Sequence, residues 1–229
     1  MPVNNLPDWE KVLSAAAHLQ TILPDAVLVG GTAAAIYAGH RLSTDADHVV
    51  TDLRERFDAV LAELESVAGR KTARINRPVL ILGSLDGIET GIRQLIRDAP
   101  LETTEVEIAG GTIKLPTPAE MLRIKAVLIL KRNATRDYHD FAALSDRISA
   151  TAGESALRQA FATFDELYPQ PNGGSALQQL LAQISKPIPY DLEGLELSEY
   201  KDLDPRWQTW SAVEEVCLRT AIMLLDGMD

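Results

Sequence analysis

The sequence predicts an α+β fold. In residues 26–52, a short apolar run, a pair of glycines, a helix-compatible stretch and a second strand follow one another. Further strand-like pieces occur at 79–82, 87–96, 104–108 and 112–115, the last two joined at Gly110-Gly111. After them, apolar residues recur mostly at helical spacing. We therefore expect a β-sheet core with an N-terminal helix in residues 1–116 and a helical region in residues 117–229.

Residues 26–52 organise the rest of the chain. A predicted helix over 7–22 precedes them, because apolar side chains recur there at intervals of three and four residues. The apolar run 26–29 is typical of a buried strand, and it stops at Gly30-Gly31. Thr32 leads into a short helix that Gly39 ends. The strand that follows carries two aspartates separated by one residue.

The spacing of Asp45 and Asp47 predicts a metal site. Side chains on a strand alternate between faces, so the two carboxylates point the same way, with Cα atoms roughly 6.5–7 Å apart. Carboxylates and substrate phosphates together suit Mg2+, with Mn2+ as an alternative. The N–H groups at Gly30-Gly31 suit a phosphate. Each feature alone is usually a turn or a solvated strand edge, and the adjacent His40 and His48 are more simply structural.

The pattern Gly30-Gly31-Thr32, Tyr37-x-Gly39-x-Arg41-x-Ser43-x-Asp45-x-Asp47 resembles the AbiEii-type nucleotidyltransferases. These are toxins of abortive-infection and toxin–antitoxin systems, within the superfamily that has the polymerase-β-like fold. The resemblance covers roughly residues 25–145. It implies a mixed sheet flanked by helices, with Asp45 and Asp47 as catalytic metal ligands. It also implies a substrate-binding set: Gly30, Gly31, Thr32, Arg41 and Ser43.

The superfamily pattern also needs a third carboxylate, on a strand beside Asp45 and Asp47. Glu89 follows the Asp86-Gly87 turn within a strand-like stretch, and it is the candidate for both metal ligand and catalytic base. A glutamate here departs from the aspartate that is more usual in the family. Asp86 is the alternative third carboxylate, and an exposed strand glutamate without a catalytic role is the simpler interpretation.

A basic segment occupies residues 121–136, which contain five bases and no acid. A helix is predicted to start at Thr117-Pro118, and a second helix is predicted over 134–148. One continuous helix would align Lys125 with the later charged residues on a single face, whereas a break near Asn133 would remove that alignment. A basic segment in an acidic chain suggests an anionic ligand, and a solvated helix face is the alternative.

The stretch from Lys125 to Asp140 resembles the AbiEii-type Lys…Arg-x-x-x-Arg-Asp-x-x-Asp segment, here with Arg132, Arg136 and Asp137. The resemblance implies that Lys125, Arg132 and Arg136 bind the triphosphate and face the glycine turn. It also implies that Lys125 and Asp137 take part in catalysis, with Asp140 as an alternative to Asp137. A helix held by salt bridges at four-residue spacing is the competing interpretation.

The bulk composition bounds the class of protein. A formal net charge of -11 argues against a protein built for nonspecific nucleic-acid binding. No apolar run approaches 18 residues, and the N-terminus lacks the pattern of a signal peptide, so no membrane partner is expected. Cys217 is the only cysteine, which excludes an internal disulfide and favours a cytoplasmic location.

The predicted function is magnesium-dependent transfer of NMP from an NTP to an acceptor hydroxyl, and the resemblance alone implies that the acceptor is RNA, such as a tRNA end, or a protein. The resemblance adds a toxin role and a cognate antitoxin as partner. The alternative is a catalytically degenerate domain that binds nucleotide or a partner. An oxidoreductase is disfavoured because G-x-G-x-x-G is missing, and a P-loop NTPase because no G-K-[ST] follows the glycines.

Overall fold

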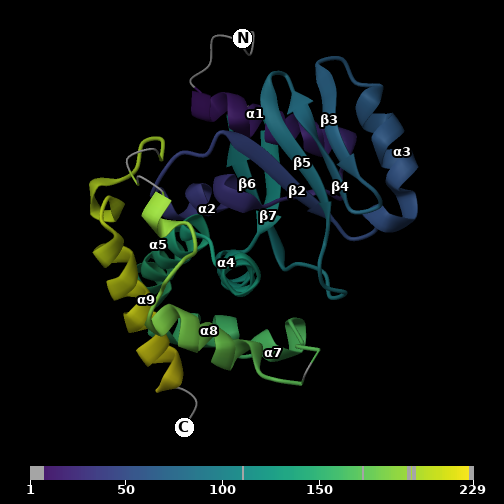
Figure 1. Cartoon of the computed structure of the whole chain (residues 1–229). Helices are drawn as coiled ribbons and strands as arrows, with labels where there is room; N and C mark the ends of the chain where they lie inside the picture. Colours follow the sequence, from purple (N-terminus) through teal and green to yellow (C-terminus); the bar gives the residue numbers. More distant parts are fainter. Residues whose placement is uncertain (1–7, 110, 172, 195–196, 198–199, 227–229) are drawn as a thin grey trace. The chain divides into compact units, whose positions relative to one another are not determined.

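The computed structural model describes residues 8–109, 111–171, 173–194, 197 and 200–226 (Figure 1). The chain forms two compact units. The first contains the residues up to Ala33 together with Ser43–Thr117, and the second contains Ala34–Leu42 together with the residues from Pro118 onward. Residues 34–42 therefore group with the helical part of the chain.

The first unit contains a five-stranded sheet of order β1-β2-β5-β4-β3 and a two-stranded sheet, β6-β7. The β2–β5 pair is parallel and the other pairs are antiparallel, so the predicted mixed sheet is confirmed. Its elements are α1 (Asp8–Ile22), β1 (Val27–Leu28), β2 (Asp45–Val50), α3 (Leu53–Glu65), β3 (Arg70–Asn76), β4 (Leu80–Leu85), β5 (Ile88–Gln94), β6 (Thr103–Ile108) and β7 (Gly111–Pro116).

One face of the five-stranded sheet packs on helices α1 and α3. Leu19 of α1 and Leu23, which follows α1, form a core with the apolar side of α3 and with side chains from the strands. The strand residues in this core are Val50, Ile81, Leu85 and Ile92. Because side chains alternate along a strand, the intervening residues of β2 and β5 lie on the opposite face. That second face carries the polar residues of the candidate site.

Two elements of the first unit differ from the sequence prediction. Strand β3 was not predicted, because its sequence Arg-Lys-Thr-Ala-Arg-Ile-Asn is mostly exposed at the sheet edge and shows no apolar alternation. Helix α2 (Gly30–Ala38) begins at the glycine pair rather than after it, and it continues into the second unit. Gly30 has a φ of 77°, a left-handed conformation that glycine adopts without strain. The predicted Gly110 turn lies outside the described residues.

The second unit is helical, as predicted. Its elements are α4 (Pro118–Arg132), α5 (Thr135–Ala152), α6 (Glu154–Phe161), α7 (Phe164–Leu167), α8 (Ala176–Ser185), the short turns η2 (Leu192–Gly194) and η4 (Pro205–Trp207), and α9 (Trp210–Leu225). Helix α5 packs against α4, α6 and α9, and Figure 1 shows it among the other helices of this unit. The side chains that α5 buries include acidic groups as well as apolar ones.

The chain does not continue as one helix from α4 into α5. Asn133 takes a φ of 47°, a left-handed conformation that asparagine tolerates better than most residues. Its side-chain amide donates to the Ile188 carbonyl at 2.9 Å, and its side-chain oxygen accepts from the Tyr138 hydroxyl at 2.6 Å. Of the two arrangements considered from the sequence, the break near Asn133 is therefore the one that occurs.

Candidate active site

Asp45 and Asp47 lie on one face of β2. Both are half-buried, whereas Ala46 and His48 between and after them are buried on the other face. Helices α1 and α3 cover the face to which Ala46 and His48 belong, so the aspartates point away from the apolar core. The Asp-x-Asp spacing thus places two carboxylates side by side, as the sequence predicted.

Strand β5 brings a third carboxylate to this face. It runs parallel to β2, with Asp45 opposite Glu89 and Asp47 opposite Gly91. Neighbouring strands are about 4.8 Å apart, so the Glu89 backbone lies directly beside that of Asp45. The Glu89 side chain is exposed. Asp86 lies instead in the turn between β4 and β5, where its carboxylate contacts His18 Nδ1 at 2.8 Å.

Two glycines make room for the Asp47 carboxylate. A Cβ on Gly91 would lie 2.2 Å from Asp47 Oδ1, and a Cβ on Gly30 would lie 3.3 Å from Asp47 Cβ. The carboxylate therefore occupies space that side chains at these positions would fill. Sequence reasoning singled out Gly30 but missed Gly91. A glycine inside a strand pattern, which often marks a close approach, was the available signal.

Two hydroxyls fix the position of Asp45. Ser43 Oγ donates to Asp45 Oδ1 at 2.6 Å, and Thr32 Oγ1 donates to the Asp45 carbonyl at 2.5 Å. Thr32 is fully buried and Ser43 nearly so. In this geometry both hydroxyls orient the aspartate, whereas the resemblance implied that they contact nucleotide. Their contact with nucleotide stays a prediction.

The carboxylate face fits a divalent cation that also uses substrate oxygens. Among the residues that the structure describes, no group of three or more His, Cys, Asp or Glu side chains is placed to hold a metal without other ligands. Mg2+ is usually bound by one or two carboxylates together with water and phosphate oxygens. Asp45 and Asp47 lie on one face of β2, with Asp47 in the space that Gly91 leaves, and they match that partial ligand set.

The second unit contains a buried carboxylate surrounded by cations. Asp140 is fully buried and accepts hydrogen bonds from Arg41 Nε at 2.9 Å and Nη2 at 3.1 Å, from Lys125 Nζ at 2.7 Å and from His40 Nε2 at 2.7 Å. Burial by itself raises the pKa of this carboxyl, but Arg41, Lys125 and His40 outweigh it and hold the pKa well below its ordinary value. Asp140 is thus a permanent anion at neutral pH.

Asp137 forms a second buried anion beside the first. It accepts from Arg132 Nε at 3.0 Å and Nη2 at 2.8 Å, and its Oδ1 is 3.7 Å from Lys125 Nζ. Lys125, which is only 3% exposed, therefore lies between two carboxylates of α5. The Arg132 side chain, by contrast, is 40% exposed, and Arg136 is exposed as well. Of the three predicted triphosphate ligands, the two arginines therefore reach solvent.

These contacts show where the basic side chains of residues 121–136 lie. A solvated helix face is wrong for Lys125, whose partners belong to the next helix, α5. It is also wrong for Arg123, which is buried and donates to Glu120 at 2.7 Å and to the Ala160 carbonyl at 3.0 Å. The expectation that Lys125, Arg132 and Arg136 face the glycine turn stays a prediction.

His40 has a larger structural role than the sequence suggested. It is buried against Asp140, and its ring stacks on that of His139 at a centroid distance of 5.8 Å. Burial lowers the pKa of His139 to about 4. The backbone carbonyl of His40 accepts from the Asp204 N–H at 2.9 Å. Since His40 and Asp140 are 100 residues apart, no local sequence signal could have paired them.

The sequence matches the family model for "Nucleotidyl transferase AbiEii toxin, Type IV TA system" over residues 11–221. The chain belongs to the AbiEii nucleotidyltransferase toxin family. The description of that family names a nucleotidyl transferase that acts as the toxin of a type IV toxin–antitoxin system. Nucleotidyltransferases of this kind generally use divalent metal ions, in agreement with the carboxylate face.

The chain is also similar to parts of longer mycobacterial proteins. The heme uptake protein MmpL11 of Mycobacterium tuberculosis is 28% identical over 96% of this chain, which corresponds to 23% of that protein. The mycolic acid-containing lipids exporter MmpL11 of Mycolicibacterium smegmatis is 26% identical, with 96% and 22% covered. The chain thus spans less than a quarter of the length of these relatives.

A solved structure with a similar fold is that of a Helicobacter pylori protein described as a nucleotidyltransferase. It is 15% identical, the TM-score is 0.52, and the match covers 96% of this chain and 98% of the other. It supports the nucleotidyltransferase-like fold assigned to this AbiEii-family chain. Within the part of the chain that the structure describes, no helix is both long and apolar enough to cross a membrane.

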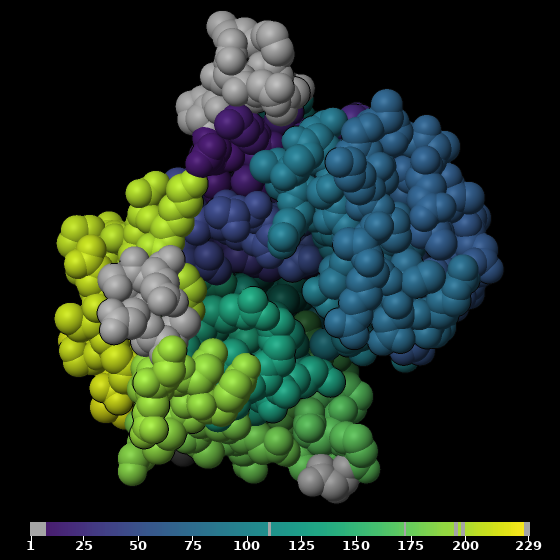
Figure 2. All heavy atoms as spheres, turned by 45° about the horizontal axis from the view of Figure 1, so that its top comes forward, coloured from purple at the N-terminus to yellow at the C-terminus, as the bar shows by residue number. Residues whose placement is uncertain are grey.

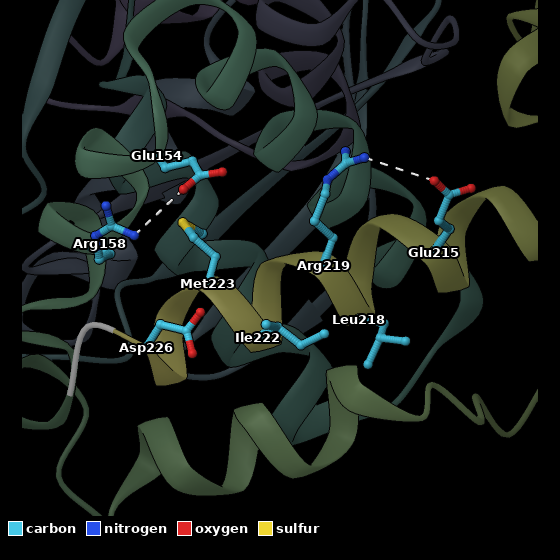
Figure 3. A pocket seen from close by; sticks show the side chains of 8 residues that line it. All are labelled: Glu154, Arg158, Glu215, Leu218, Arg219, Ile222, Met223 and Asp226. Carbon is cyan, nitrogen blue, oxygen red and sulfur yellow. Dashed lines mark ion pairs between the residues drawn. The ribbon is translucent and has the colours of Figure 1, made fainter. Parts of the chain in front are cut away.

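A groove of about 350 Å³ lies in the second unit, between α6 and α9 (Figure 3). Four of its charged lining residues form two pairs, in which Arg158 is 3.7 Å from Glu154 and Arg219 is 4.0 Å from Glu215. None of the AbiEii-type site residues lines it. The groove is therefore not the candidate active site.

Proposed function

We propose that this AbiEii-family protein is a magnesium-dependent toxin that moves NMP from an NTP to an acceptor hydroxyl on RNA, such as a tRNA end, or on a protein, in the cytoplasm. The observation that supports it best is the register of β2 with β5. This register puts Asp45, Asp47 and Glu89 on one face. Such an arrangement suits a reaction in which two carboxylates hold a metal–nucleotide and a third assists the acceptor.

The three carboxylates have separate roles in this proposal. Asp45 and Asp47 hold the cation, Mg2+ or alternatively Mn2+, which supplies charge neutralisation at the phosphates and polarises the reacting phosphoryl group. Glu89 is a further ligand and accepts the proton of the acceptor hydroxyl. The acceptor oxygen forms a bond to the α-phosphorus, the bond between that phosphorus and the α–β bridging oxygen breaks, and pyrophosphate leaves.

Backbone and cationic groups serve the phosphates. The N–H groups of Gly30 and Gly31, at the start of α2, bind a phosphate of the NTP, and Thr32 and Ser43 keep Asp45 in position. Arg41 is held by Asp140 and contributes positive charge to the substrate region.

The cations of α4 and α5 are assigned to the phosphates on the resemblance of this segment to the AbiEii-type one. Arg132 and Arg136, which are exposed, meet the leaving pyrophosphate. Lys125 and Asp137 belong to the same catalytic set: Asp137 fixes Arg132 with two hydrogen bonds, and Lys125 adds positive charge from the interior. A structure with Mg2+ and a nonhydrolysable NTP would test this assignment.

The test of the activity is transfer of label. Purified protein is incubated with each α-³²P-labelled NTP, Mg2+ or Mn2+, total RNA and proteins from a lysate, and the labelled macromolecule is identified. We expect metal-dependent labelling that Asp45→Asn abolishes. Asp58→Asn removes a matched charge from an exposed carboxylate of α3 that pairs with Arg77, and it should label normally. Equal labelling without metal would contradict the proposal.

The alternative is a degenerate domain that binds NTP without transferring it. It draws support from the glutamate in the third carboxylate position and from the burial of Lys125. It predicts magnesium-dependent NTP binding with no labelled acceptor for any NTP. The proposed toxin role has its own readout: expression should arrest growth, Asp45→Asn should not, and the cognate antitoxin should relieve the arrest.

A further inference from the structure

Strand β3 is the centre of a basic stretch that the proposed chemistry does not use. Residues 66–85 contain four bases and no acid, within a chain whose formal net charge is -11. Two of the bases are occupied: Arg70 donates to Thr90 on the helix-covered side, and Arg77 pairs with Asp58. The other two, Lys71 and Arg74, are exposed.

In the sheet register, Lys71 and Arg74 each lie in a row of paired residues that crosses the strands and ends at one of the proposed catalytic aspartates. Lys71 is paired with Ser84, Ser84 with Glu89, and Glu89 with Asp45. Directly paired residues share a face, so Lys71 lies on the same face as both carboxylates. Three strand spacings of about 4.8 Å put the Lys71 and Asp45 backbones about 14 Å apart.

The next row repeats the arrangement. Arg74 is paired with Leu82, Leu82 with Gly91, and Gly91 with Asp47. Arg93 also projects from this face of β5, is 46% exposed at its side chain, and has its Nε 3.7 Å from Asp47 Oδ1. The acidic side chains of this face thus lie on β2 and β5, and its basic side chains lie on the β3 edge and, with Arg93, on β5 beside Asp47.

Lys71 and Arg74 are available to a ligand. Within the described ranges neither forms an ion pair. Figure 1 shows β3 at the edge of the five-stranded sheet, and Figure 2 shows the blue segment that contains β3 at the molecular surface. Other exposed cations of the described residues, such as Arg147 and Lys186, also form no ion pair, so what distinguishes Lys71 and Arg74 is their place in the sheet. Their alignment with the carboxylates points to an anionic ligand that reaches the reaction centre.

We propose that Lys71, Arg74 and Arg93 form a track that binds the phosphate backbone of a nucleic-acid acceptor and leads its terminal hydroxyl to Glu89. The inference rests on the proposed function and selects RNA over protein as the acceptor. Two strand spacings put the Lys71 backbone about 10 Å from that of Glu89, which at about 3.4 Å per stacked nucleotide corresponds to about three nucleotides, so the track holds phosphates shortly behind the reacting end.

The composition of this face also indicates which parts of the RNA acceptor the protein contacts. The residues that project from it between the charged groups include Leu80 and Leu82, and none of its described strand residues is aromatic. Bases therefore lack the aromatic platforms that give stacking energy in single-strand binding. The track binds through phosphate contacts, so its affinity is sensitive to salt and tolerant of sequence.

The test is binding of a fluorescent single-stranded RNA by anisotropy, without NTP or metal, over a range of salt. With three phosphate contacts, the slope of log K against log[salt] should be about -2, and Lys71→Ala/Arg74→Ala should reduce its size to about -0.7. The double variant should lose at least about tenfold in affinity. Arg147→Ala/Lys186→Ala removes the same charge from exposed sites in the second unit and should bind as the wild type does.

Further measurements separate this proposal from the proposed function. Asp45→Asn should bind RNA at least as tightly as the wild type while transferring nothing. Calorimetry with Mg2+ and NTP should be unchanged in Lys71→Ala/Arg74→Ala, which also shows that the variant is folded, and in transfer assays only the KM for RNA should rise. Undiminished RNA binding by the double variant would overturn the track. So would labelling of protein alone by a wild type that does not bind RNA.

Discussion

Glu89 lies beside Asp45 on the adjacent strand, in parallel register and on the same face of the sheet. A neighbouring carboxylate in this position can share a bound cation with Asp45 and still reach an acceptor hydroxyl. Asp86, the other candidate from the sequence, is three residues earlier and contacts His18. The register therefore favours Glu89 as the third carboxylate.

The first prediction concerns this assignment. Glu89→Gln should keep magnesium-dependent NTP affinity within a few-fold, because Asp45 and Asp47 remain, but it should slow transfer by about 100-fold or more, the size expected for loss of a general base. Glu89→Asp should retain part of the activity. Asp86→Asn is the matched control and should transfer normally. Equal rates for the wild type and Glu89→Gln in single-turnover labelling would exclude Glu89 as the base.

The second prediction concerns the space that Gly91 leaves for the Asp47 carboxylate. Gly91→Ala places a methyl group where Asp47 Oδ1 now lies, since the two atoms would be 2.2 Å apart. The carboxylate must move, and a displacement of about 1 Å at a reacting centre can cost about 100-fold in rate. We expect weaker magnesium-dependent NTP binding by calorimetry and a comparable loss of transfer. Ser84→Ala, on the same face of β4, should change neither quantity.

The third prediction concerns the two buried anions of α5. Asp140→Asn removes the carboxylate that Arg41 and Lys125 share, both of which are largely buried, and we expect the free energy of unfolding to fall by about 3–5 kcal/mol. Asp137→Asn should cost less, because the Arg132 side chain is 40% exposed and water can solvate it. Denaturant unfolding of the two variants measures the difference. A larger loss for Asp137→Asn would contradict this ranking.

The sequence predicted the elements whose pattern is local. Strand β2 was predicted from its place after the first strand, the glycine turn and the short helix, and α4 was predicted from the short-range start signal at Thr117-Pro118. Strand β3 was missed because an exposed edge strand needs no apolar residues and is held by backbone pairing with β4. Pairing partners are set by the whole sheet, which a local pattern does not contain.

The distinction between local pattern and tertiary packing also explains which parts of the candidate site could be predicted from the sequence. Asp45 and Asp47 share a face because of their spacing alone, so the sequence suffices for them. The proximity of Glu89 to Asp45 depends on strand register, and the contact between His40 and Asp140 joins residues 100 positions apart. Such relationships follow from tertiary packing. The buried lysine between two carboxylates was likewise invisible to a helix-face argument, because its partners lie on the next helix.

The last prediction concerns pH. His48 is fully buried on the core side of β2, and burial lowers its pKa to about 4, against the opposing effect of hydrogen bonds to the Ala46 and Ala16 carbonyls. In the unfolded chain its pKa is the ordinary 6.5. Between these values the unfolded state binds a proton that the folded state does not, so the free energy of unfolding must fall as the pH decreases from 6.5 toward 4.

We therefore expect His48 to destabilise the fold by about 2 kcal/mol between pH 7 and pH 5, and to have almost no pH-dependent effect above pH 7. Denaturant unfolding at several pH values measures this slope. His48→Gln should flatten the slope in this range whatever its effect on stability at pH 7, since glutamine does not titrate. A slope that is as steep in His48→Gln as in the wild type would show that protonation of His48 does not govern the acid sensitivity of the sheet.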